Sequence, residues 1–197
     1  MFWGMKLALI LALVAAPAFA APAFAAPAFA ECPMPADTGP EMLNLIEKAQ
    51  AAENFKEGRS VSDEMWQVWL RAPDEVAQSA LDAGLVRRNA YDFAGAFKEF
   101  DRLASYCPEF AEGFNQRAYI HFLREDYAKA LPDLDIALRL NPYHIAAQSG
   151  RALTLMNLGR LDEARAQLLI AVENNPWLSE AALLAEGAPL GPKGKDI

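Results

Sequence analysis

The sequence has few of the residues that usually carry chemistry, with 2 histidines and 2 cysteines among its 197 residues. His121 and His144 lie far apart, and no cysteine stands at zinc-ligand spacing from either, so the usual metal motifs are missing. There is also no glycine-rich phosphate loop, and no serine or cysteine nucleophile has an identifiable base partner. We therefore expect a protein that is not an enzyme and that requires no metal and no cofactor.

Basic residues are outnumbered by acidic ones. The chain has 18 Lys and Arg against 26 Asp and Glu, which gives a net charge of −8 at pH 7. Nucleic acids and anionic membrane surfaces attract positively charged proteins, so this balance argues against both as partners. Asp133 and Asp135 are spaced by two residues, which places them on different faces of a helix. We expect a solvated acidic face there, and not two carboxylates that work together.

The first thirty residues have the pattern of a secretory signal peptide. Lys6 supplies a positive charge, an apolar run covers residues 7–16, and small residues follow. The pentapeptide Ala-Pro-Ala-Phe-Ala then occurs three times within residues 16–30. Each copy ends in an Ala-Phe-Ala cleavage pattern, which predicts processing after Ala20, Ala25 or Ala30.

An uncleaved membrane anchor is the alternative interpretation of this leader, because residues 7–30 carry no charge. Pro17, Pro22 and Pro27 would interrupt the spanning helix three times, which favours the signal peptide. We therefore expect a periplasmic or secreted bacterial protein with no membrane attachment after the signal is cleaved.

Both cysteines remain after removal of the leader. An even pair in an exported protein favours a disulfide, here between Cys32 and Cys107. Such a bond would close a long loop and restrict the unfolded chain. Two unpaired thiols remain the alternative. A redox-active pair would need closely spaced or specially activated cysteines, and the sequence has neither.

Most of the mature chain consists of a unit of about 34 residues written three times, over residues 77–110, 111–144 and 145–178. The eighth and twentieth places of each copy are small, the seventeenth, twenty-fourth and twenty-seventh are apolar, and the thirty-second is proline. The small residues are Gly84, Ala118 and Ala152 at the eighth place and Ala96, Ala130 and Ala164 at the twentieth. The apolar residues are Phe93, Tyr127 and Leu161 at the seventeenth place, Phe100, Leu134 and Leu168 at the twenty-fourth, and Leu103, Ala137 and Ala171 at the twenty-seventh. The prolines are Pro108, Pro142 and Pro176.

Each copy is expected to form two antiparallel helices, because small residues let helices approach closely while larger neighbours fill the flanking grooves. The copies resemble the tetratricopeptide repeat (TPR), and the second copy matches that family's pattern along most of its length. The resemblance implies an all-α fold, an α-solenoid of three helix-turn-helix repeats. It says little about function, since repeat solenoids are scaffolds for many different partners.

The segments on either side of the repeats predict atypical end units. Within residues 31–76, a linker precedes a helix over 41–56, a turn over 56–60 and a second helix that is capped by Ser62 or Asp63 and ends before Pro73. This hairpin is expected to cap the N-terminal end of the solenoid, with its two tryptophans in the core. Residues 179–197 are expected to form a short helix from Ser179 to Glu186 and a mobile tail from Gly187 onward.

The mature chain as a whole also resembles small exported TPR proteins of proteobacteria. The shared features are the Trp66-x-x-Trp69 helix and the turns at Ala72–Asp74 and Tyr106–Pro108. This resemblance implies that Cys107 has a fixed structural partner, and it implies no function.

In TPR proteins the first helix of each repeat lines a concave groove, so the resemblance also implies a binding surface. Carried onto this chain, the exposed groove positions are Leu81, Leu85, Arg88 and Asn89 in the first copy; Asn115, Tyr119, Phe122 and Leu123 in the second; and Ser149, Leu153, Met156 and Asn157 in the third. This groove is largely apolar with an amide edge. It lacks the converging cations that TPR domains use to clamp a terminal carboxylate.

The expected function is therefore that of a non-catalytic adaptor of the cell envelope, which binds a peptide or helix of another protein in the groove. The predicted helix over 41–56 or the C-terminal tail could instead fill the groove, and a self-associating structural protein would then be the better interpretation. A thiol-based redox protein is a third possibility, which requires an accessible and reducible cysteine.

Overall fold

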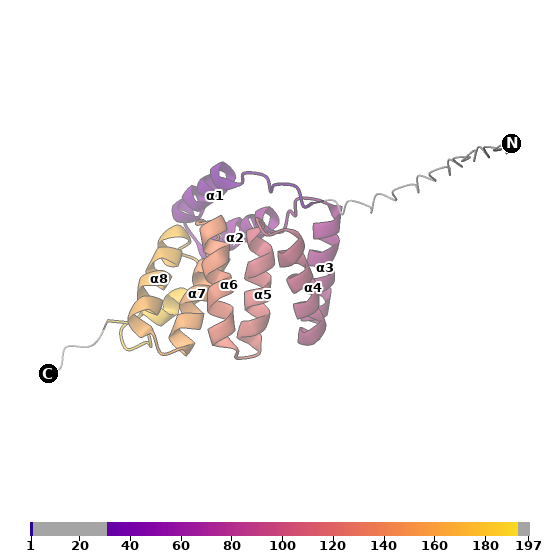
Figure 1. The fold of residues 1–197 in the computed structure, drawn as a ribbon. Coiled ribbons are helices and arrows are strands. Elements are labelled where there is room, and N and C mark those ends of the chain that lie inside the picture. Colours follow the sequence, from indigo (N-terminus) through magenta and orange to yellow (C-terminus); the bar gives the residue numbers. More distant parts are fainter. Residues whose placement is uncertain (2–30, 193–197) are drawn as a thin grey trace. The chain divides into compact units, whose positions relative to one another are not determined.

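The computed structural model describes Met1 and residues 31–192. These residues form eight α-helices and one short 3-10 helix, with no strand among them (Figure 1). The α-helices are α1 Gly39–Ala51, α2 Phe55–Trp69, α3 Glu75–Asn89, α4 Phe93–Tyr106, α5 Ala111–Leu123, α6 Tyr127–Leu140, α7 Ile145–Asn157 and α8 Leu161–Asn174; η1 spans Ser179–Leu184.

The three repeats form consecutive packed pairs, α3 with α4, α5 with α6 and α7 with α8, and each pair packs on the next. This confirms the prediction of an all-α solenoid. The three alanines at the twentieth place, Ala96, Ala130 and Ala164, are fully buried where the helices of each pair cross. At Gly84, a side chain would overlap the ring of Phe100, so the helices could not approach as closely with a larger residue.

The N-terminal hairpin, α1 and α2, begins and ends at other residues than the sequence predicted. Its turn lies at 52–54, and residues 56–60, expected as a turn, belong to α2. Asn54 caps α2, with its side chain accepting a hydrogen bond from the backbone N–H of Glu57 at 3.1 Å. Gly58 therefore lies in the first turn of a helix, where it does not act as a helix breaker.

The hairpin also lies in a different place from the one predicted. It does not cap the first repeat, because α1 packs against α8 of the third repeat (Figure 1). Gly58 leaves the space that the indole of Trp177 occupies, and any side chain there would overlap that ring. The Trp177 indole N–H donates to the carbonyl oxygen of Ala49 at 2.8 Å. Nearby, Asn175 donates to the Ser62 hydroxyl at 2.9 Å.

A disulfide joins the start of the described chain to the first repeat. The structure pairs Cys32 with Cys107, the residue that follows α4, across 75 positions of sequence. Cys107 is buried, and Cys32 packs beside it on the core of the first repeat. Residues 31–38 then lead from this bond to α1 at the other end of the stack (Figure 1). The N-terminal segment is thus attached to the first repeat by the disulfide and to the third by packing.

The helix of the C-terminal segment is shorter than predicted, and the residues after it are more closely packed on the repeats than predicted. A 3-10 helix replaces the expected helix from Ser179 to Glu186, and no side-chain cap holds its start. The tail was expected to be mobile from Gly187, but Leu190 is 2% exposed and packs against the core of the third repeat. Its backbone N–H donates to Leu183, and its carbonyl oxygen accepts from Arg165, so the tail is held on α8 as far as this point.

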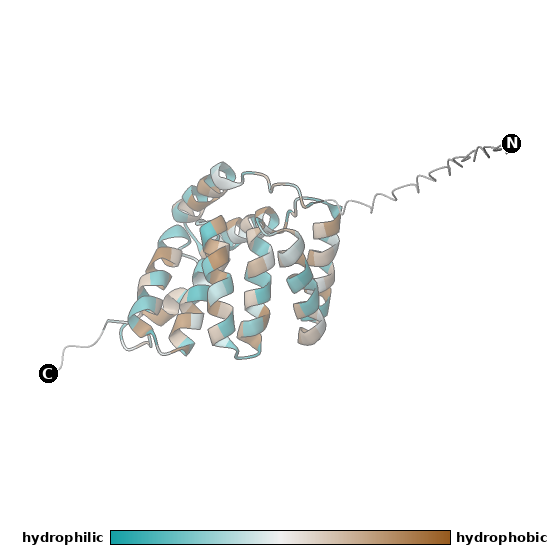
Figure 2. Ribbon diagram, viewed as in Figure 1, coloured by the Kyte–Doolittle hydropathy of each residue, from teal (hydrophilic) through white to brown (hydrophobic). Residues whose placement is uncertain are grey.

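The predicted signal peptide and its cleavage sites lie outside the described residues. Within Met1 and residues 31–192, no helix is long and apolar enough to cross a membrane. Figure 2 shows hydrophobic and hydrophilic residues alternating along the visible faces of the repeat helices, as expected for amphipathic helices that pack on one side.

Ala130→Leu tests the packing of the repeats. Ala130 is fully buried between α5 and α6, so the larger side chain should lower the free energy of unfolding by about 1–3 kcal/mol through overpacking. Ala128→Leu, at an exposed position of α6, is the matched control and should have little effect. Chemical denaturation measures both, and an unchanged midpoint for Ala130→Leu would contradict the assigned repeat frame.

Reduction tests the disulfide. Breaking the bond between Cys32 and Cys107 should lower the stability of the oxidised protein by about 2–4 kcal/mol, because the unfolded chain regains the freedom that the closed loop had removed. The measurement is denaturation with and without reductant. Full alkylation of both cysteines in unreduced, unfolded protein would show instead that the thiols are free.

Candidate binding cavity

A cavity of about 930 Å³ lies on the concave side of the repeats. Its walls come mainly from the first helices of the three repeats (α3, α5 and α7), from α2, and from the segment after α8, with Phe93 of α4 and Leu134 of α6 as further members. On the α2 side the wall consists of Met65, Trp66, Trp69 and Leu70. The hairpin therefore turns what would be an open groove into a cavity with a defined end.

Nine of the twelve predicted groove residues line this cavity: Leu85, Arg88, Asn89, Asn115, Tyr119, Phe122, Leu123, Ser149 and Leu153. The other three lie elsewhere. Leu81 is fully buried in the core between α3 and α4, and Met156 packs in the core of the third repeat. Asn157 is exposed, with its amide donating to the carbonyl oxygen of Leu153 at 2.8 Å.

Neither α1 nor the described part of the C-terminal tail fills the cavity. No lining residue comes from α1, which the sequence had suggested as an occupant, and none comes from residues 185–192 of the tail. The two tryptophans of α2 contact each other edge to face, with ring centroids 5.2 Å apart, and form a wall of the cavity. Within the part of the chain that the structure describes, the cavity thus remains open to a ligand.

A buried polar network lies behind the cavity wall. Its centre is the carboxylate of Glu112, in the first turn of α5, which is 1% exposed. The carboxylate accepts hydrogen bonds from Asn115 at 2.9 Å, from Gln116 at 2.6 Å and from His144 at 2.7 Å. The positive end of the α5 dipole adds to these donors. A buried carboxylate with three donors is well compensated, so the network fixes these side chains in place.

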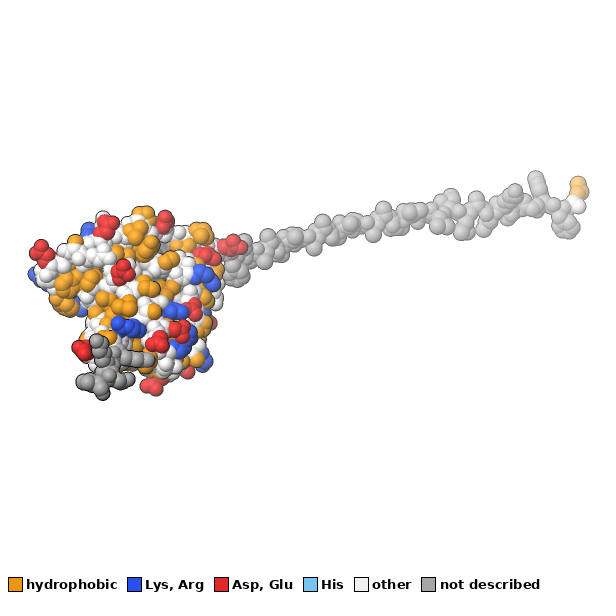
Figure 3. All heavy atoms as spheres, turned by 90° about the vertical axis from the view of Figure 1, so that its left-hand side faces the viewer, with side chains coloured by type: hydrophobic (Ala, Val, Ile, Leu, Met, Phe, Trp, Pro, Cys, Tyr) orange, Lys and Arg blue, Asp and Glu red, His pale blue; other side chains and the backbone are white. Residues whose placement is uncertain are grey.

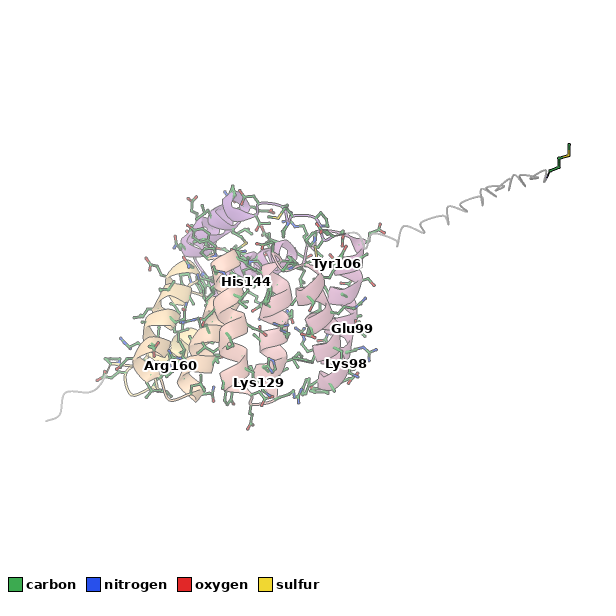
Figure 4. All side chains as sticks on the ribbon, in the orientation of Figure 1. Lys98, Glu99, Tyr106, Lys129, His144 and Arg160 are labelled. Carbon is green, nitrogen blue, oxygen red and sulfur yellow. A yellow bond between two sulfur atoms is a disulfide. The ribbon has the colours of Figure 1, made fainter. Side chains whose placement is uncertain are left out.

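His144 connects the second and third repeats through this network. Its Nδ1 accepts from the backbone N–H of Ala147 at 3.2 Å, so its Nε2 carries the proton that is donated to Glu112. The ring stacks on Trp69 of α2, with centroids 4.5 Å apart and planes 11° from parallel. His144 and Tyr106, labelled in Figure 4, come from the end of the repeats that the hairpin covers. The network therefore also holds the hairpin.

Arg88 joins the same network from inside the cavity. Its guanidinium donates to the side-chain oxygen of Gln116 at 2.7 Å and lies over the ring of Tyr119, 5.5 Å from the centroid. Gln116 in turn donates to Glu112. The buried carboxylate thus orients a cation at the cavity surface.

Three ionisable residues that the sequence singled out, Asp133, Asp135 and His121, lie outside the cavity. Asp133 was predicted to lie on a solvated face, but the structure shows it buried. It accepts two hydrogen bonds from Arg117, at 2.6 and 2.8 Å. These bonds raise the pKa of Arg117 above its ordinary value, since they favour the charged form. Asp135 is exposed and pairs with Arg151. His121 is nearly buried, and burial lowers its pKa.

Sequence reasoning missed the Glu112–His144 pair, although a signal was present. His144 occupies the thirty-fourth place of its copy, where the other copies have the apolar residues Phe110 and Leu178. Glu112 lies 32 residues earlier in the same copy, close to one repeat length, so the pair joins the start of α5 to the start of α7, which His144 caps. A polar residue at an apolar place of a repeat, one period away from an acid, is the pattern that would have revealed the pair.

The cavity holds no recognisable catalytic arrangement. Among the residues that the structure describes, no group of His, Cys, Asp and Glu is placed to hold a metal ion. Its walls are mostly apolar and aromatic with a few amides and hydroxyl groups, one arginine and one glutamate, which suits binding of a ligand more than its conversion.

Comparisons with known proteins support the resemblance to TPR proteins. The chain is 36% identical over 59 residues to a TPR repeat-containing protein of Rhizobium etli, covering 30% of this chain and 29% of that protein. It is 38% identical over 64 residues to a tetratricopeptide repeat protein 36 homolog of Nematostella vectensis, covering 32% and 35% respectively. The chain thus spans about a third of the length of the curated relatives it matches. No family model and no solved structure matches.

The stacked helix pairs and the concave cavity define an α-helical repeat scaffold. Together with the two similarities, this fold is consistent with a tetratricopeptide repeat protein.

Glu112→Ala tests the buried network. The substitution removes the acceptor of three side-chain donors in the interior, so we expect a loss of about 3–5 kcal/mol in the free energy of unfolding. Glu109→Ala, at an exposed position of the preceding turn, is the control and should change stability little. Equal effects of the two substitutions in urea denaturation would contradict a structural role for Glu112.

Proposed function

We propose that this protein is a non-catalytic interaction scaffold of the bacterial cell envelope, which binds a short peptide segment of another protein in the cavity. The observation that carries the proposal is the cavity itself, about 930 Å³ of concave space that the described chain leaves open between α2 and the repeats. Proteins named for the same repeat are the relatives of this chain, and such repeats serve widely as platforms for other proteins.

The size and lining of the cavity favour a short segment as ligand. Its volume lies within the range of about 300–1,000 Å³ typical of sites for small ligands, whereas a helix with its side chains is about 10–12 Å wide and needs an open groove. Tyr119 is 44% exposed, and Phe122, one turn later, is half-buried on the same wall. Large rings at the centre of a site contribute most of the binding energy in typical interfaces.

The proposed location rests on the sequence of the leader and on the cysteines. A cleaved signal peptide would deliver the protein to an oxidising compartment, where a bond between Cys32 and Cys107 persists. Cys107 is 1% exposed, which does not favour a role as a reactive thiol. The disulfide is therefore better explained as a structural element of an exported protein.

The test is photo-crosslinking in living cells. A photoreactive amino acid replaces Tyr119 in the cavity, and in a matched control it replaces Tyr143, a tyrosine that is 37% exposed outside the cavity. We expect a discrete crosslinked partner from position 119 and none from position 143. Fractionation of the same cells tests the envelope location, and recovery in the cytoplasm without processing would contradict it.

The second arm of the test is the variant Tyr119→Ala with Phe122→Ala. It should weaken binding of the crosslinked partner by at least about 2 kcal/mol while leaving the helix content unchanged, because both rings line the cavity and neither is fully buried. Asp135→Ala, on the exposed face of α6, should leave binding intact. Full binding by the double variant would contradict a partner site in this cavity.

A further inference from the structure

Arg88 specifies the chemistry of the partner. We infer that the peptide segment carries an acidic side chain that pairs with Arg88, within two residues of a large apolar side chain that lies against Leu85, Tyr119 and Phe122. The inference rests on the proposed function, because it names the kind of segment that the same cavity takes.

The guanidinium of Arg88 has two N–H groups to spare. Arginine has five, and three are used here: Nε and Nη2 donate to the side-chain oxygen of Asn89 at 3.3 and 3.1 Å, and Nη1 donates to Gln116 at 2.7 Å. One N–H therefore remains on each of Nη1 and Nη2. These two N–H groups can donate to the oxygens of a carboxylate, a group that arginine frequently binds in a bidentate manner.

The charge of Arg88 also lacks a direct counterion. Within the described part of the chain no carboxylate lies within ion-pair distance of it, whereas Arg87, Arg117 and Arg151 each pair with an aspartate. The nearest acid in its network is Glu112, which reaches Arg88 only through Gln116. Arg88 is the sole basic residue of the cavity wall. A cation held among apolar and amide groups favours an anionic ligand.

The surroundings of Arg88 favour an acidic side chain over the carboxylate at the end of a chain. The cavity wall includes residues on both sides of Arg88 along the chain, Leu85 before it and, after it, Tyr91 in the turn and Phe93 at the start of α4. A peptide can therefore continue beyond the point where its carboxylate meets Arg88. Recognition of a terminal carboxylate would instead require the chain to stop there.

The cavity is also electrostatically directional. Glu180, on η1 at the far end of the repeats, is the acidic residue of the wall, while Arg88 belongs to the first repeat. An acidic side chain is attracted to Arg88 and repelled from Glu180, so the two charges orient the segment. Apolar contacts with Leu85, Tyr119 and Phe122 then follow on the same side as Arg88.

The experiment is a selection from randomised heptapeptides against the oxidised, processed protein. In one arm both peptide ends are blocked by flanking sequence, and in the other the C-terminus is free. We expect the blocked arm to enrich Asp or Glu within two positions of Phe, Trp or Leu. Exchanging the acidic residue of a selected peptide for its amide should weaken binding about tenfold, the loss expected for a charge-assisted hydrogen bond.

Variants of the protein complete the test. Arg88→Gln should abolish the acidic preference while keeping the apolar one, and Arg87→Gln, which removes the same charge from the neighbouring ion pair, should change neither. Arg88→Lys keeps the charge without the paired donors and should retain a weaker acidic preference, which preserves the test if Arg88→Gln does not fold.

Three results separate the claims. Selected peptides without acidic preference, or with a preference that Arg88→Gln leaves intact, overturn the inference and leave the proposed function standing. Binding that requires the free C-terminus overturns it in favour of a terminal carboxylate. Absence of any enriched peptide in both arms contradicts the proposed function itself.

Discussion

The contact between Trp177 and Gly58 determines how the N-terminal hairpin lies on the repeats. The indole occupies the space that the glycine leaves, and its N–H bonds to the carbonyl oxygen of Ala49, 128 residues away in sequence. Equivalent places in the other two copies hold Glu109 and Tyr143, which stay exposed. Only the third repeat therefore has the residue that binds the hairpin, and this explains why α1 packs on α8.

The cavity is a consequence of this arrangement. With α1 on the third repeat and α2 returning toward the first, Met65, Trp66 and Trp69 become a wall in front of the concave helices. Behind the wall, Glu112 and His144 link adjacent repeats and support both Trp69 and Arg88. One buried network thus supports the position of the hairpin and of the cation that the proposed ligand would meet.

The outer surface offers no comparable feature on the side that Figure 3 presents. Hydrophobic, acidic and basic side chains are intermixed there, without a broad field of one charge. Lys98, Lys129 and Arg160, labelled in Figure 4, lie toward the end of the repeats opposite the hairpin and are spread over separate pairs of helices. The cavity, by contrast, brings together apolar groups and an arginine that has no direct counterion among the described residues.

Sequence could predict the repeats because each copy repeats the same packing problem. A small residue at the crossing and a large one beside it, such as Ala130 with Leu134, recur at fixed spacing and are buried in the structure. The resemblance to TPR proteins also indicated nine residues that line the cavity. The hairpin could not be placed, because Gly58 looks like a turn residue until its distant partner Trp177 is known.

Polar burial was equally hidden from the sequence. Asp133 has the pattern of a surface residue. The hydrogen bonds from Arg117 on the facing helix compensate the cost of burying its charge. Leu190 lies in a segment rich in glycine and proline, and it is buried by packing on the core of the third repeat, where Arg165 also donates to its carbonyl oxygen. In each case the contact that accompanies burial joins two different elements. The spacing of apolar residues along a single helix cannot predict such a contact.

Hydrogen exchange of the α1 backbone tests the central claim most directly. An isolated helix of 13 residues is marginal in water, so lasting protection of α1 amides must come from docking on the third repeat. The account predicts that α1 is protected to a similar degree as α8 in the intact protein, and that Trp177→Ala removes the protection of α1 while α5 keeps its own. Rapid exchange of α1 in the unmodified protein would contradict the docked hairpin and the cavity that depends on it.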